Sequence, residues 1–91
     1  MTKLELNKKL ADLYGLEAMS YFQRAILLID DWNMLMPLAL NHKIGFAAMN
    51  NIFLAGRDGV EIKESYNDHE SPEDAAKYAI ALALVKLAES K

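Results

Sequence analysis

The chain of 91 residues is 53% hydrophobic and 25% charged, and its formal net charge is -3. These values predict one globular domain over residues 1–91 and exclude a low-complexity or disordered chain. The absence of cysteine excludes disulfides, thiolate metal sites and a cysteine nucleophile, and the presence of only two arginines argues against nucleic-acid binding. No signal peptide or membrane-spanning apolar run is recognisable, so we expect a cytoplasmic protein.

The first predicted element is an amphipathic helix from about Lys3 to Tyr14. Thr2 and Glu5 have the spacing of a capping box, in which each side chain accepts from the backbone N–H of the other residue. Gly15 is a typical residue just beyond a helix end. We therefore expect a helix that covers one side of the domain.

Residues 16–30 are compatible with either one helix or two short strands. The runs LEAMSYF and AILLID are separated by Gln23 and Arg24, and the second run is bounded by Asp30 and Asp31. Because two isoleucines stand among the four consecutive apolar residues ILLI of the second run, we predict two strands here.

A second helix is predicted to follow the sequence DDWN. Asp and Asn are common capping residues, and Asn33 as the cap would leave Pro37 near the first turn, where the missing N–H is tolerated. His42 and Lys43 would lie at the carboxyl end, where positive charge is favourable.

The pattern then changes to that of strands. We expect GFAAM and IFLAG to form a hairpin around Asn50 and Asn51, because asparagine tolerates the left-handed backbone of a tight turn. The turn at Asp58 and Gly59 leads to VEIKESY, which alternates apolar and charged residues like a strand with one wet face.

The last predicted helix spans Ser71 to Leu87. Ser71 can cap it, Pro72 fits its first position, and two acidic residues follow at the positive end of the helix dipole. From Tyr78 to Val85 the sequence is almost entirely apolar. This excess favours either a core helix on a sheet or a helix whose second face meets another subunit. The residues proposed for the subunit contact are Tyr78, Ala81, Leu82 and Val85.

Together these elements predict a small single α+β domain. We expect an antiparallel sheet of about five short strands packed with three helices, of which the C-terminal one is long.

The sequence lacks the usual signatures of catalysis. It contains no nucleophile elbow, phosphate-binding loop or His-Glu-x-x-His motif. His42 and His69 are far apart and lack the ligand spacing of a metal site. We therefore expect no enzyme activity, no cofactor and no bound metal.

Two surfaces are candidates for binding. Trp32 is either a half-buried anchor between helix and sheet or a contact residue for a partner or ligand. The acidic residues Asp68, Glu70 and Glu73 form either a solvated face or a docking site for a basic host protein.

The segment DWNMLMPL, followed by NHKI and later by Ser71-Pro72 before an alanine-rich helix, resembles the small uncharacterised tailed-phage proteins of the NinX type. In those proteins an Asn-Trp-Asn or similar stretch precedes a proline-containing helix that ends in His-Lys-Ile or a related sequence. The similarity extends from about Leu4 to Leu87, although the middle hairpin is not clearly matched. It implies an accessory protein in an infected bacterium and supplies no catalytic residues.

We therefore expect a non-catalytic phage accessory protein that binds a host protein, acting as a homo-oligomer without nucleic acid or membrane. The alternative is a small-molecule binder that sequesters a nucleotide signal of host defence. Its pocket at a subunit interface would be lined by Trp32, Arg24, Arg57 or Lys43.

Overall fold

A computed structural model of the protein describes residues 2–14 and 28–90. Within these ranges the fold is α+β, with three α-helices and a three-stranded antiparallel sheet. The elements in chain order are α1 (Lys3–Tyr14), the 3-10 turn η1 (Leu28–Asp30), α3 (Trp32–Asn41), β1 (Gly45–Ala48), β2 (Ile52–Arg57), β3 (Val60–Ser65), the 3-10 turn η2 (Tyr66–Asp68) and α4 (Pro72–Glu89). None of the described helices combines the length and the apolar character needed to cross a bilayer.

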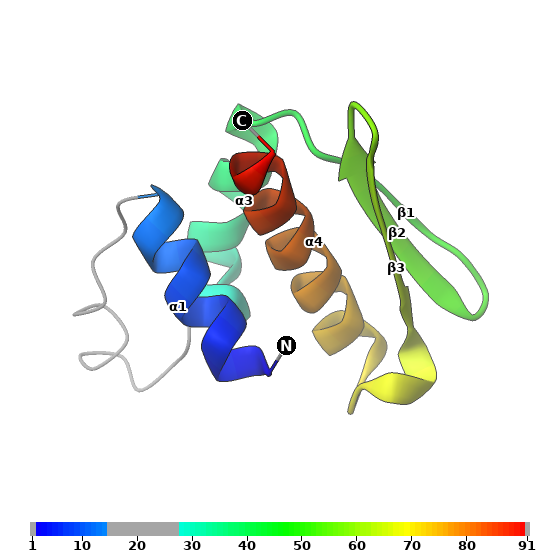
Figure 1. Cartoon of the computed structure of the whole chain (residues 1–91). Coiled ribbons are helices and arrows are strands. Elements are labelled where there is room, and N and C mark those ends of the chain that lie inside the picture. The colour runs from blue at the N-terminus through cyan, green and yellow to red at the C-terminus, as the bar shows by residue number, and fades with distance from the viewer. Residues whose placement is uncertain (1, 15–27, 91) are drawn as a thin grey trace.

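The elements form three layers, with α4 in the middle (Figure 1). One side of α4 packs on β2 and β3, and the other side packs on α1 and α3. The side chains of Ala79, Ala81, Ala83, Leu84 and Val85 are therefore buried although they point in different directions around the helix. A helix that is apolar on all sides needs neighbours on all sides. Here α1, α3 and the sheet of the same chain provide them.

The sheet has the order β1-β2-β3, and its inner face covers α4. Phe53 and Ala55 of β2 are buried on this face, which fits the alternation of side chains along a strand. The predicted turn at Asp58 and Gly59 joins β2 and β3, and both of these residues have positive φ (46° and 88°), as in a tight hairpin.

Two expectations about the strands were wrong. The described chain has three strands, where about five were predicted. The hairpin between β1 and β2 does turn at Asn50 and Asn51, but neither asparagine has the positive φ that was the reason for predicting it. Its closing contact is instead a backbone hydrogen bond of 2.9 Å from Met49 N to Ile52 O.

Most of the predicted strand pair at 16–30 lies outside the described residues. Its last three residues do not continue a strand, because they form the 3-10 turn η1. The backbone N–H of Ile29 donates to Oδ1 of Asn7 in α1 (3.1 Å), and the Ile29 side chain is fully buried. A contact with a helix side chain thus replaces the strand ladder that the apolar run suggested.

Local capping signals place the helix starts. The capping box of α1 is present, with Thr2 and Glu5 each accepting from the backbone N–H of the other. The cap predicted for α3 was wrong, because Asp31 rather than Asn33 caps it and its carboxylate accepts from Asn33 N (2.9 Å). Pro37 consequently lies inside the helix, where its side chain faces solvent.

Candidate functional site

An open apolar groove of about 390 Å³ lies where α3, α4 and the inner face of the sheet meet. α3, α4 and the sheet each contribute two side chains, and the two side chains lie on the same face of their helix or of the sheet. The helices provide pairs four residues apart, and the paired strands β1 and β2 provide two aromatic rings that stack with centroids 5.9 Å apart. The lining residues are Trp32 and Met36 of α3, Phe46 of β1, Phe53 of β2, and Ala76 and Ile80 of α4.

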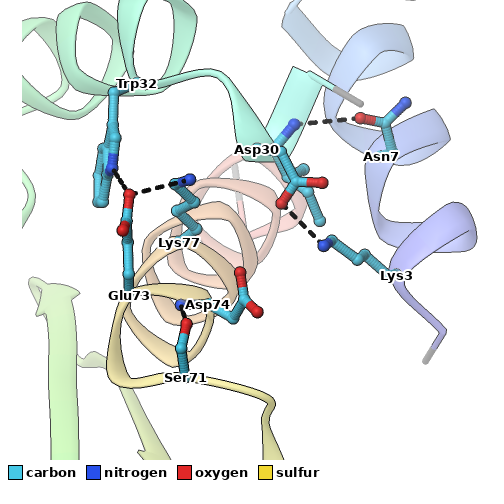
Figure 2. A network of polar contacts seen from close by, with 9 residues as sticks. Lys3, Asn7, Asp30, Trp32, Ser71, Glu73, Asp74 and Lys77 are labelled. Carbon is cyan, nitrogen blue, oxygen red and sulfur yellow. Dashed lines mark hydrogen bonds and ion pairs between the residues drawn. The ribbon is translucent and has the colours of Figure 1, made fainter. Parts of the chain in front are cut away.

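Polar contacts hold Trp32 at one end of this groove (Figure 2). Its indole Nε1 donates to Oε1 of Glu73 in the first turn of α4 (2.7 Å), and Nζ of Lys77 lies 3.2 Å from the same oxygen. The Lys77 ammonium also lies 5.4 Å from the centre of the indole ring, within the range of a cation–π contact. The hydrogen bond from Trp32, followed by the contact with Lys77, lowers the pKa of Glu73.

Further polar contacts fix the backbone near Trp32 and Glu73, and they involve α1, η1 and the start of α4 (Figure 2). Oγ of Ser71 accepts from Asp74 N (3.1 Å), which fixes the start of α4 and hence the position of Glu73. Nζ of Lys3 lies 2.8 Å from Oδ1 of Asp30, so α1 holds the residue two positions before Trp32. Glu73 and Lys77 of α4 thus position the ring of Trp32, and α1 fixes Asp30 of η1 just before it.

The predicted acidic surface is divided between two places. Asp68 and Glu70 border a polar hollow of about 660 Å³ beside η2, whereas Glu73 belongs to the rim of the apolar groove. The hollow is also lined by Lys3, Glu64, Asn67, His69, Asp74 and Tyr78. Nε2 of His69 lies 2.8 Å from Oε1 of Glu64, so the histidine pairs with a carboxylate of its own chain. In the described part of the chain no group of acidic and histidine side chains has the arrangement of a metal site.

Among the described residues proposed for a nucleotide pocket, Trp32 lies apart from Arg57 and Lys43. Arg57 donates to the carbonyl of His42 (2.9 Å) and pairs with Asp58 (2.9 Å), at the carboxyl end of α3. Trp32 begins the same ten-residue helix. Trp32 and the carbonyl that Arg57 contacts therefore lie about 15 Å apart along the helix axis. Lys43 is exposed near Arg57, and Arg24 lies outside the described residues.

The residues proposed for a subunit contact differ in exposure. Ala81 and Val85 are fully buried within the chain, which removes them from the surface that another subunit could reach. Tyr78 and Leu82 are half-buried. The burial of Tyr78, and then the charges of Glu64 and Glu5, raise its pKa. The homo-oligomer remains a prediction, and α4 can supply at most these two residues of the proposed set to its contact.

Sequence reasoning singled out Trp32, but it did not find the groove. Phe46 and Phe53 were assigned to the hairpin without a role, and Ala76 and Ile80 were parts of the last helix. The spacing of four residues in each helix was visible in the sequence. That both pairs face the same pair of phenylalanines depends on how the layers pack.

Comparisons with protein-family models, with curated proteins and with solved structures found no match.

Proposed function

We propose that this chain is a non-catalytic phage accessory protein that acts by binding a host protein, and that the apolar groove around Trp32 is its binding surface. The observation that carries the proposal is the accessible groove lined only by apolar side chains, three of them aromatic. Tryptophan and other aromatic residues in pockets contribute much of the energy at protein interfaces. The assignment to a phage rests on the resemblance of the segment around Trp32 to the NinX type.

The chemistry of the groove supports an apolar protein segment over a nucleotide as its occupant. No charged side chain lines it, and Lys77, the cation that lies against the ring of Trp32, pairs with Glu73. A nucleotide phosphate would need cations beside the groove, whereas Arg57 contacts Asp58 and the carbonyl of His42 at the far end of α3, and Lys43 follows that same end.

Pull-down from the bacterial host with two matched variants of α3 tests this proposal. Met36→Lys puts a charge into the groove, whereas Leu40→Lys puts the same charge one turn further on, at a side chain that is 66% exposed. Wild type and Leu40→Lys are expected to retain the same host protein, and Met36→Lys to lose it. Circular dichroism should show that both variants keep their helices. Equal retention by all three proteins, or by none, would contradict the proposal.

A further inference from the structure

In the described part of the chain, no strand lies beside the outer edge of β1, and the backbone groups of this edge are the feature of interest. The N–H of Met49 donates to the carbonyl of Ile52, the first residue of β2. Along an antiparallel strand, every second residue directs its N–H and C=O to the same neighbouring strand. Gly45 and Ala47 therefore bond to β2. The N–H and C=O groups of Phe46 and Ala48 point away from the sheet, where no described strand pairs with them.

The edge strand β1 has only four residues, and it lacks the charged side chains and prolines with which proteins often protect a free edge. All four of its residues are exposed. The opposite edge strand β3 instead carries the exposed charged residues Glu61 and Lys63. Charged side chains hinder pairing with a further strand. The β1 edge is therefore the one suited to accept another strand.

The free edge borders the apolar groove. Phe46 belongs to both, because its backbone faces outward and its side chain lies beside Phe53 on the inner face. A strand added to β1 would run about 4.8 Å from it, and every second side chain would point to that inner face. These side chains would enter the groove against Trp32 and Met36 of α3. The edge and the groove thus fit one extended segment.

Charges at the two ends of β1 set the direction of such a segment. α3 and α4 both run toward the end where Lys43 precedes β1, whereas β1 runs away from it (Figure 1). Lys43 is exposed and has no carboxylate partner among the described residues. Glu73 lies with Trp32 at the other end, and its side chain stays 61% exposed although Oε1 contacts both Trp32 and Lys77. A segment antiparallel to β1 would place its amino end near Glu73 and its carboxyl end near Lys43.

We propose that β1 binds an extended peptide segment by strand addition. The segment is antiparallel to β1, alternates apolar and polar side chains, is positively charged at its amino end and carries a carboxylate at its carboxyl end. This inference rests on the proposed function and specifies its partner. Main-chain hydrogen bonds to Phe46 and Ala48 supply affinity, and the groove selects the apolar side chains.

Amide NMR with a synthetic octapeptide tests the binding mode. The probe begins with lysine, continues with alternating valine and threonine and ends in a free carboxyl group. The amides of Phe46 and Ala48 are expected to shift and to gain protection from hydrogen exchange, whereas the amide of Ala47 already bonds to β2. Shifts confined to the Trp32 indole, or no shifts at millimolar peptide, would overturn strand addition. Equal affinity of the charge-reversed peptide would overturn the direction.

A matched pair of variants separates backbone from side-chain binding. Ala48→Pro removes the outward N–H at a position where an edge strand tolerates proline, and Ala48→Val keeps it. Loss of one hydrogen bond should weaken the octapeptide roughly tenfold in the first variant only. Equal binding by both variants would contradict the inference. A peptide-free dimer in the ultracentrifuge that Ala48→Pro dissociates would assign the edge to a second copy instead, and so would also overturn it.

The same variants distinguish this inference from the proposed function. If Ala48→Pro keeps the host protein that Met36→Lys loses, the groove binds its partner without strand addition, and the inference fails alone. If the octapeptide binds at Phe46 and Ala48 but no host protein is retained, the proposed function fails and strand addition stands.

Discussion

Trp32 and Glu73 join the first turns of α3 and α4 through a hydrogen bond of 2.7 Å between the indole Nε1 and Oε1. This bond is the largest cause of the lowered pKa of Glu73. Trp32→Phe keeps an aromatic ring and removes the donor. The pKa of Glu73 should therefore rise toward its ordinary value of 4.5 in an NMR titration of the carboxylate.

The free energy of unfolding of Trp32→Phe should also depend less on pH than that of wild type. A lowered pKa means that Glu73 stabilises the folded state above pH 4.5, and that this contribution is lost as the pH falls through the folded-state pKa. Trp32→Phe should therefore lose less stability than wild type over this acidic range. Glu5 is an internal control, because Thr2 and not Trp32 lowers its pKa. An unchanged titration of Glu73 would show that the indole does not hold the carboxylate.

The cap of α4 gives a second prediction. Oγ of Ser71 accepts from Asp74 N, and Ser71→Ala leaves this N–H without its partner. The free energy of unfolding in urea should fall by about 1 kcal/mol. Ser71→Asn provides another capping side chain and should recover most of the loss. If both variants were equally destabilised, the hydroxyl would not act as a cap.

The elements that were predicted correctly are those fixed by neighbours in the sequence. The capping box at Thr2 and Glu5, the start of α4 at Ser71 and the turn at Asp58 and Gly59 each depend on contacts within a few residues. The misplaced cap of α3 shows the limit of this reasoning. Both Asp31 and Asn33 are residue types that can cap a helix. In the structure the cap is Asp31, which is almost fully buried.

The groove could not be predicted because it depends on distant segments. It combines residues from Trp32 to Ile80, and their meeting requires α4 to lie between two layers. The same arrangement explains the apolar stretch from Tyr78 to Val85. Both faces of this helix need cover, and α1 and α3 provide it on the side away from the sheet, where one of the two interpretations placed another subunit.

A lysine substitution in α4 tests this interpretation. Ala81 is fully buried, so Ala81→Lys forces a charge into the core. The cost of an unpaired buried charge exceeds several kcal/mol and is comparable to the total stability of a small domain, about 5–15 kcal/mol. We expect this variant to be unfolded by circular dichroism. Glu89→Lys, which breaks only an exposed pair with Lys9, should change stability by less than about 1 kcal/mol. A folded Ala81→Lys protein that had only lost a partner subunit would contradict the layered core.

The contact between Tyr14 and Leu84 ties α1 to α4. The Tyr14 hydroxyl donates to the Leu84 carbonyl (2.6 Å), and burial raises the pKa of this tyrosine above 10.0. At neutral pH, Tyr14→Phe should lower the free energy of unfolding by about 1 kcal/mol, the usual net value of such a bond.

The difference between wild type and Tyr14→Phe should depend on pH. Because the folded-state pKa is raised, the contribution of Tyr14 is fully present below pH 10.0 and is lost as the pH rises through the folded-state pKa. The unfolded wild type ionises first, which stabilises its unfolded state, whereas phenylalanine has no proton to lose. The two urea midpoints should therefore converge above pH 10.0. A difference between the two midpoints that stays constant or widens would mean that the Tyr14 hydroxyl is as accessible in the folded chain as in the unfolded one. The hydroxyl would then not hold α1 against α4.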